Sequence, residues 1–430
     1  MLTEEIRLKE NLLSFVWQHS LYDTNFLYTR FREKAIAVSP GRRNFGEGPR
    51  FLQAEIRLGE KTFVGNVAIH RKASDWAYSH HNTDPAYDGV ILLAVEEDDR
   101  LIRRIDDSVL PVVVLQYPET LKQKYRALTL GSQGFACASF LKTEMKPVEV
   151  KNACTRLMTE RLERKYNDIL EIHRQAENDW HETFHILLFR SMGLGSNKEA
   201  FMALARNVPY AKLCQEKGDI RNLEAMLFGG AGLLDGAVYD PYKSDLEKRF
   251  ETLSRRHGLQ ALSYCSWSSK KVRPYNFPPK RIAELAKLID AGTFTLNNIL
   301  SCESVTEVKR LFDIELSDYW KRNFSFGQGS ARQHRAVGDI TADLVVINHV
   351  APLMFAYGRQ TGEAALEERA LDLLYQVKAE ANKYTSGWTK RGITIENAFH
   401  SQAFIQLATE YCLRRRCCEC FIGIKALKKI

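Results

Sequence analysis

The sequence predicts an α+β protein, in which a mixed N-terminal α/β domain precedes a mostly α-helical domain and a short cysteine-rich tail. Short runs of β-branched and aromatic residues are confined to the N-terminal part, and helical periodicity dominates the remainder. The length of 430 residues is enough for two or three domains. We expect a nuclease-like domain at residues 1–146, a helical domain at 147–410 and a basic cysteine-rich tail at 411–430.

The N-terminal domain is expected to begin with an amphipathic helix over residues 3–20, where apolar residues recur among charges. Four strands are expected after it, because each run is short, apolar and bounded by glycine or proline. The predicted strands are Phe51–Gly59, Thr62–His70, Val90–Val95 and Val112–Tyr117. A loop rich in histidine and acidic residues joins the second and third strands, and such loops are frequent locations of functional sites.

Helices are predicted through most of the second domain, separated by segments that contain proline or glycine. The predicted ranges are Thr155–Gln175, Trp180–Met192, Lys198–Asn207, Leu223–Leu234, Ser244–His257, Lys280–Ala291, Ser304–Phe312, Leu344–Tyr357, Gly362–Asn382 and Ser401–Arg414. The glycine-rich run Phe228–Leu233 lacks the Lys-Ser/Thr ending of a phosphate-binding loop, so we interpret it as a place of close helix packing.

Bulk composition limits the class of protein. The net charge of +8 favours a polyanionic partner such as DNA or RNA. No run of about 18 apolar residues occurs, so no membrane span is expected. The acidic N-terminus does not resemble a secretory signal, and the nine scattered cysteines are typical of reduced thiols in the cytoplasm.

Residues along nearly the whole chain match the pattern of one family. In the N-terminal domain they are Gly48, Pro49, Phe51, Ala54, Gly65, Val67, Ile69, His70, Ser74, Asp75, Trp76, His81, Tyr87, Val90, Ile91, Leu92 and Val95. Further matches are Arg161–Lys165, Leu223–Ala225, Gly229, Gly232, Arg273, Pro274, Pro278, Arg281, Asn348, Pro352 and the C-terminal cysteines. The chain therefore resembles an uncharacterised bacterial family of the Bacteroidetes type, a domain of unknown function.

The N-terminal pattern of that family resembles PD-(D/E)XK-type nucleases. The resemblance implies an Asp on one strand and a Glu-x-His on the next, which would place two carboxylates and a base around a divalent cation such as Mg²⁺, a metal that prefers oxygen ligands and activates water. In this sequence the Asp and Glu positions hold Arg50 and Ala68, and His70 is kept. A further family histidine, expected after Ile91 and Leu92, is replaced by Leu93. We therefore expect Mg²⁺ binding and metal-dependent cleavage to be lost or weak.

Five residues of this region are the candidate catalytic residues: His70, Asp75, His81, Glu47 and Glu55. Glu47 or Glu55 can replace a missing carboxylate only if the local backbone turns its side chain toward the site. Adjacent strand residues face opposite sides of a sheet, so Glu55 is expected to point away from the side that Ala54 faces. The alternative is that Asp75 caps a turn or helix and that His70 is a packed strand histidine.

A second candidate site is the His-Glu-x-x-His motif of His181, Glu182 and His185. On a helix the two histidines share one face and can bind zinc, with Glu182 as the general base of a hydrolase. Glu199 or Glu224 would then supply a third ligand, and Asp179 can cap the helix. The motif is short enough to arise by chance.

The third candidate site is a cysteine group near the C-terminus. Cys412, Cys417 and Cys420 have a spacing that can hold zinc or an iron–sulfur cluster if a fourth ligand arrives. The family resemblance makes Cys137 one candidate for this ligand, and His400 and Cys418 are others. The nuclease resemblance is compatible with this, since some such nucleases join their chain ends by a cluster. The alternative is a set of ordinary reduced cysteines near a basic tail.

Taken together, these patterns predict a nuclease-like protein that binds DNA or RNA and has a degenerate metal-dependent site. A zinc hydrolase that uses the motif at residues 181–185 is the first alternative. The second is a non-enzymatic scaffold whose helical part binds a protein partner.

Overall fold

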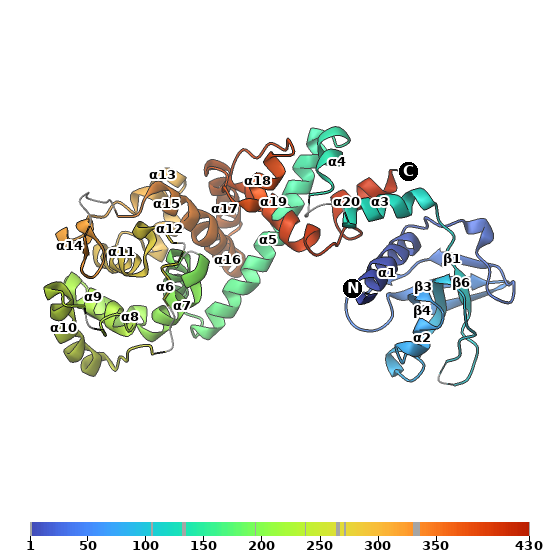
Figure 1. Cartoon of the computed structure of the whole chain (residues 1–430), viewed down its shortest axis with the longest axis horizontal. Coiled ribbons are helices and arrows are strands. Elements are labelled where there is room, and N and C mark those ends of the chain that lie inside the picture. Colours follow the sequence, from blue (N-terminus) through green and yellow to red (C-terminus); the bar gives the residue numbers. More distant parts are fainter. Residues whose placement is uncertain are drawn as a thin grey trace. The chain divides into compact units, whose positions relative to one another are not determined.

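The computed structural model describes residues 2–104, 106–130, 135–193, 195–236, 238–263, 267–270, 272–329 and 336–429. The chain forms two compact units. The first, here called the sheet unit, comprises Met1–Met145 and Ala408–Ile430, and the second, the helical unit, comprises Lys146–Leu407. Residues 411–430, which we expected to form a separate tail, thus belong to the sheet unit. The protein is mixed α/β, with its main sheet in the N-terminal part (Figure 1).

One mixed sheet organises the sheet unit. Its strands are β1 (Ala35–Ser39), β2 (Arg42–Arg43), β3 (Phe51–Leu58), β4 (Lys61–Lys72), β5 (Val90–Glu97) and β6 (Val112–Val114). Their order is β1-β3-β4-β5-β6, with β2 also paired to β3. Strand β3 is antiparallel to β1, β2 and β4, whereas β4, β5 and β6 run parallel. All four predicted strands are present, and β1 and β2 are additional.

The helices of the sheet unit are α1 (Leu2–Gln18), α2 (Asp75–Tyr78), α3 (Glu119–Leu130), α4 (Ala138–Thr143) and α20 (Phe421–Lys428). Helices pack on both faces of the sheet. The apolar side of α1, from Leu12 to Trp17, packs on one face, and Tyr125 of α3 and Leu427 of α20 join the same core. Trp76 of α2 packs on the opposite face against Leu93 and its neighbours. The two-sided burial explains the continuous apolar runs Val67–Ile69 of β4 and Val90–Val95 of β5.

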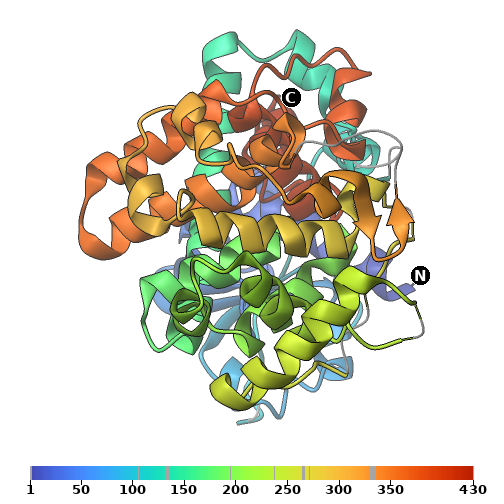
Figure 2. The ribbon, with the colours of Figure 1, turned by 90° about the vertical axis from the view of Figure 1, so that its left-hand side faces the viewer.

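In the part of the chain that the structure describes, the helical unit consists almost entirely of helices and contains one small hairpin. Its longer helices are α5 (Pro147–Gln175), α6 (Trp180–Met192), α7 (Lys198–Asn207), α9 (Ile220–Gly230), α10 (Pro241–His257), α11 (Pro278–Ala291), α16 (Ala351–Thr361), α17 (Ala364–Gln376) and α19 (Ala398–Gln406). Its shorter elements are α8 (Tyr210–Gln215), α12 (Leu296–Ser301), α13 (Val305–Arg310), α14 (Asp318–Arg322), α15 (Asp339–Val345), α18 (Lys383–Thr389) and the hairpin β7 (Asn323–Ser325) and β8 (Gln328–Gly329). In Figure 2 the gold helix α11 crosses the middle of the unit, where it contacts α9 and β7.

The glycine-rich run near residue 229 lies at the end of α9, where that helix packs on α10. A Cβ added to Gly229 would lie 2.2 Å from the Phe250 ring of α10. A Cβ at Gly230 would lie 2.6 Å from a methyl group of Val208. The interpretation of this run as close helix packing is confirmed.

One helical stretch of the helical unit, Asp339–Thr361, is long and apolar enough to cross a membrane by length and composition. It includes α15, a π-helical segment at Val346–Val350 and α16. Of its most apolar window, 72% is buried inside the protein. The core helix of a soluble protein passes the same test, so this stretch is weak evidence for a membrane span.

Replacing Gly229 with alanine is expected to destabilise the helical unit by about 1–3 kcal/mol, the usual cost of overpacking. Alanine alone would favour the helix by up to ~1 kcal/mol, so a net loss isolates the clash with Phe250. Denaturant unfolding followed by circular dichroism measures the change.

The control is Gly338→Ala, because no described atom lies within 4 Å of a Cβ at Gly338. Gly338 is the N-cap of α15, where alanine is less favourable than glycine, so we expect a loss of at most about 1 kcal/mol, smaller than that of Gly229→Ala. A Gly229→Ala protein as stable as the parent would contradict close packing at this position.

Candidate functional site

The centre of the candidate site is the place where β3 begins beside β4. Phe51, the first residue of β3, pairs with Val67 of β4 in antiparallel register. Arg50 directly precedes Phe51 and Ala68 directly follows Val67, so both residues lie just beyond the same end of this pair, because antiparallel partners advance in opposite directions. The two positions at which the nuclease resemblance implies carboxylates hold a guanidinium and a methyl group.

A carboxylate that was not predicted from the sequence reaches this place from α1. Glu10 Oε1 lies 2.8 Å from His70 Nδ1, and Glu10 Oε2 lies 3.6 Å from Arg50 Nη2. Because a carboxylate only accepts hydrogen bonds, Nδ1 of His70 is the donor. The Glu10 and His70 side chains are 13% and 10% exposed, whereas that of Arg50 is 37% exposed. We call Glu10, Arg50 and His70 the Glu10 cluster.

A stack of rings extends from His70 along the loop after β4. The ring of His81 lies 5.1 Å from that of His70 and 3.7 Å from that of Tyr87, nearly parallel to both. Trp76 meets His81 and Tyr87 edge-on, each at 5.5 Å. Burial, and then the neighbouring His70, lower the pKa of His81 to about 4. The stack is therefore uncharged at His81 near neutral pH.

The other predicted residues of this region lie around the Glu10 cluster without joining it. Asp75 is the first residue of α2, and its carboxylate accepts a hydrogen bond from the backbone N–H of Lys72 at 2.9 Å. This is the turn-capping role that we considered as the alternative. Glu47 is exposed in the loop before β3. Both acids are among the candidate catalytic residues that the sequence predicts together with His70.

Glu55 and Leu93 also have positions that the strands determine. Glu55 pairs with Val64 of β4, whereas Ala54 next to it is buried in the core beneath α1. Leu93 pairs with Ala68 and is buried with it in the core beneath α2. Position 93 is therefore a core position here, and Glu55 faces away from the side on which α1 packs.

The His-Glu-x-x-His motif lies on α6 as predicted, and Asp179 caps that helix by accepting from the His181 N–H at 2.7 Å. His185 is fully buried, and its Nε2 donates to the carbonyl oxygen of Val208 at 3.1 Å. Burial lowers the pKa of His185 to about 4. Glu182 accepts from the Tyr210 N–H at 2.9 Å, while His181 is exposed.

Through these contacts the motif residues pack α6 against the segment around Val208 and Tyr210. Nε2 of His185 is already hydrogen-bonded and is therefore not free to bind zinc. Across the ranges that the structure describes, no three His, Cys, Asp or Glu side chains are arranged to hold one metal ion. The geometry therefore gives the zinc hydrolase no specific support.

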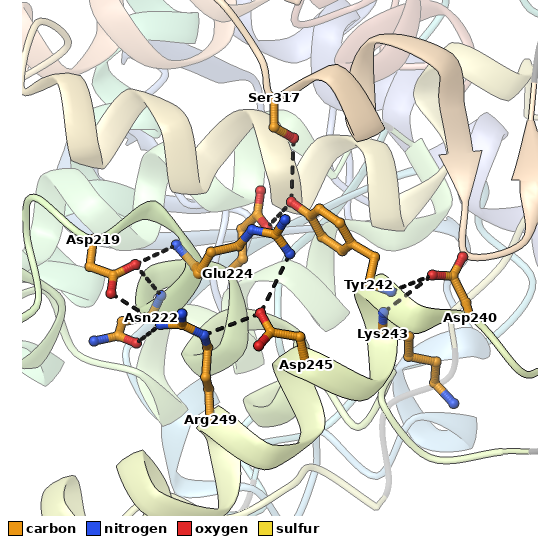
Figure 3. Close-up of polar contacts among 10 residues, drawn as sticks. Asp219, Asn222, Glu224, Asp240, Tyr242, Lys243, Asp245, Arg249 and Ser317 are labelled. Carbon is orange, nitrogen blue, oxygen red and sulfur yellow. Dashed lines mark hydrogen bonds and ion pairs between the residues drawn. The ribbon is translucent and has the colours of Figure 1, made fainter.

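Glu224, a predicted third ligand for that zinc, belongs instead to a polar network of α9 and α10 (Figure 3). Its carboxylate accepts from the Tyr242 hydroxyl at 2.5 Å, and Ser317 lies 3.3 Å from the same hydroxyl. Nearby, Asp219 and Asp240 cap the two helices by accepting backbone hydrogen bonds. Burial raises the pKa of Glu224 to about 7. These hydrogen bonds connect α9 and α10, and each of those named joins two groups of the protein itself.

Four cysteines that the sequence grouped line one cavity of the sheet unit. They are Cys137, Cys412, Cys417 and Cys420, and the cavity volume is about 160 Å³. The adjacent Cys418 lies elsewhere, in the core beneath α1.

Comparison with known proteins finds one relationship. A family model described as "Protein of unknown function (DUF2851)" matches residues 10–383. No curated protein matches the chain. No solved structure matches it either.

The raised pKa of Glu224 predicts a pH-dependent stability of the helical unit. A carboxyl whose pKa is raised in the folded state contributes stability that is full below its ordinary pKa and is lost as the pH rises through the folded pKa, here about 7. Glu224→Gln keeps an acceptor for Tyr242 and cannot ionise. Relative to the parent, the variant should gain about 3 kcal/mol in unfolding free energy between pH 4.5 and pH 7.

Urea unfolding at several pH values measures this difference. Glu251→Gln is the control, since Glu251 lies on α10 in an exposed pair with Arg255. Its profile should parallel that of the parent. Parallel profiles for Glu224→Gln and the parent would exclude an ionisable, buried Glu224.

Proposed function

The chain belongs to this family of unknown function, and on that premise we propose that it is a nuclease-like protein that binds nucleic acid and has lost metal-dependent cleavage. The observation that carries the proposal is the ion pair of Arg50 with Glu10, at the place where the resemblance implies a pair of acids. The family match itself covers residues 10–383 without a functional description. The proposal therefore rests on the site.

The order of elements supports a nuclease-like domain. Helix α1, strands β1, β3 and β4, helix α2 and the buried strand β5 follow one another along the chain. This is the succession that the nuclease resemblance implies, with α2 in the crossover between the parallel strands β4 and β5. A shared order of elements is an analogy at the level of the fold. It therefore supports a nuclease-like domain, whereas any catalytic chemistry has to be argued from individual residues.

The residues of the Glu10 cluster do not fit a hard divalent cation. Mg²⁺ is held by oxygen ligands, usually one or two carboxylates with water. Glu10 is the sole carboxylate in the cluster, and one of its oxygens already accepts from His70. The guanidinium of Arg50 lies 3.6 Å from the other oxygen, where it neutralises the charge that would attract a metal. We therefore assign no metal-dependent step to this site.

The same substitutions favour binding to a phosphate backbone. Arg50 is partly exposed, so its guanidinium can exchange Glu10 for a phosphate oxygen. Arg42 and Arg57 are exposed on β2 and β3. Phe45 is 70% exposed and lies under the guanidinium of Arg43, which suits it to stacking on a base. These exposed cations and the ring of Phe45 are the groups that we expect to contact nucleic acid.

The double variant Arg50→Asp/Ala68→Glu is expected to gain Mg²⁺ binding, because it would place carboxylates at the two positions where the resemblance implies them. Isothermal titration calorimetry with Mg²⁺ and Mn²⁺ measures binding, and gel assays with DNA and RNA measure any cleavage. The parent should show neither.

The matched control is Arg50→Asn/Ala68→Gln, which has the same side-chain sizes without the added negative charges. Since Ala68 is 1% exposed, circular dichroism must show that both double variants remain folded. A folded Arg50→Asp/Ala68→Glu protein that behaves like the Asn/Gln control would contradict the proposed origin of the site.

Binding of the parent to DNA or RNA is expected to weaken steeply with salt, because phosphate contacts release counterions. Arg50→Ala should lower the affinity several-fold at moderate salt and reduce the slope of log K against log salt by about 1. Fluorescence anisotropy with labelled single- and double-stranded oligonucleotides measures both quantities.

Arg103→Ala serves as the charge-matched control, since Arg103 is exposed and paired with Asp107. It should leave the slope unchanged. Binding that is insensitive to salt, or equal losses for both variants, would count against a specific role of Arg50.

A further inference from the structure

Four cysteines from distant parts of the sequence meet in the sheet unit. Cys137 directly precedes α4, and Cys412 ends a π-helical segment at Leu407–Cys412. Cys417 follows in the next turn, and Cys420 directly precedes α20. All four line the same cavity of about 160 Å³. From these positions we propose that Cys137, Cys412, Cys417 and Cys420 hold an iron–sulfur cluster.

The local backbone is built to bring the C-terminal cysteines together. A Cβ at Gly423 would lie 2.2 Å from the carbonyl oxygen of Cys417, so only glycine lets the start of α20 approach that loop. Arg415, between the first two cysteines, has a left-handed φ of 54°. Cys417 Sγ lies 3.8 Å from the carbonyl oxygen of Leu128, at the end of α3. The loop is thereby folded back on α3 near Cys137.

The burial of the cysteines suits metal ligation. Cys137 and Cys420 are 7% and 5% exposed, and Cys412 and Cys417 are half-buried. Four cysteine side chains that line one cavity can reach the same metal centre, which they bind as thiolates.

The spacing and the cavity favour a cluster over a single zinc ion. Cys412-x4-Cys417-x2-Cys420 with a distant fourth cysteine is a spacing found in iron–sulfur proteins. Zinc binds sulfur at ~2.3 Å, which would draw four thiolates to within about 3.8 Å of one another and leave no space between them. The cavity that the four cysteines line, with its volume of about 160 Å³, has room for iron and sulfide. Arg415 also lines it, and its guanidinium pairs with Glu4 at 3.0 Å.

Such a cluster would connect the two chain segments that make up the sheet unit. Cys137 lies in the segment that ends at Met145, and the other three lie in the segment that begins at Ala408. The whole helical unit lies between them in the sequence. This inference does not depend on nucleic-acid binding, so either proposal can fail without the other.

The test begins with the full-length protein purified without exposure to air. Iron, acid-labile sulfide and zinc are measured per chain, together with the visible absorption spectrum. We expect on the order of two to four iron atoms with matching sulfide, and the broad visible absorption of a cluster. One zinc per chain in place of iron would overturn the proposal. Absence of iron after anaerobic reconstitution with ferrous iron and sulfide would also overturn it.

Neighbouring residues supply matched variants. Cys417→Ala should reduce iron and sulfide to background, whereas Cys418→Ala should retain the parental iron content. Cys418 is 4% exposed in the core beneath α1, so its variant controls for the loss of a buried thiol. Circular dichroism establishes that both are folded. Equal iron contents in these two variants would contradict ligation by Cys417.

Discussion

The burial of α1 against β3 and β4 is the constraint on which the sheet unit depends. Leu13, Phe15, Val16 and Trp17 are completely buried, so α1 has one possible rotation about its axis. That rotation sends Glu10, the last charged residue before this apolar half, to His70 and Arg50. The position of the carboxylate is thus a consequence of hydrophobic packing. An ion pair at this level of exposure contributes little stability by itself.

The substitutions at the Glu10 cluster are consistent with one another. A carboxylate at position 68 would be buried, since Ala68 is 1% exposed, and a buried unpaired charge is costly. A metal ion or a nearby arginine can balance such a charge. With alanine at 68 and arginine at 50, a single pair with Glu10 balances the site without a metal. Alanine at position 68 thus avoids a buried charge, and the carboxylate of Glu10 has a cationic partner in Arg50.

The strands and most helices could be predicted because their patterns are local. Alternating or continuous apolar runs gave β3, β4, β5 and β6, and α6 and α7 have the predicted limits. Glu10 could not be found in this way, because its partner lies 60 positions away along the chain and only the packing of α1 connects them. The motif on α6 shows the opposite case. The spacing of its two histidines is correct for zinc. In the folded protein, however, His185 is hydrogen-bonded to the carbonyl oxygen of Val208. This tertiary contact cannot be predicted from a local sequence pattern.

Composition alone does not predict how the C-terminal residues pack. Basic residues and cysteines suggested a separate tail, but Cys418 and Leu427 lie in the same core as the apolar side of α1. Burial lowers the pKa of Arg43 on β2, and Glu419 of the C-terminal segment opposes part of this shift. Strand β2 and the C-terminal segment therefore interact electrostatically. Arg50 also lowers the pKa of Arg43. The C-terminal segment therefore packs against the structure that positions the Glu10 cluster. A metal centre that fixed this segment would, through the shared core, also fix the helix that carries Glu10.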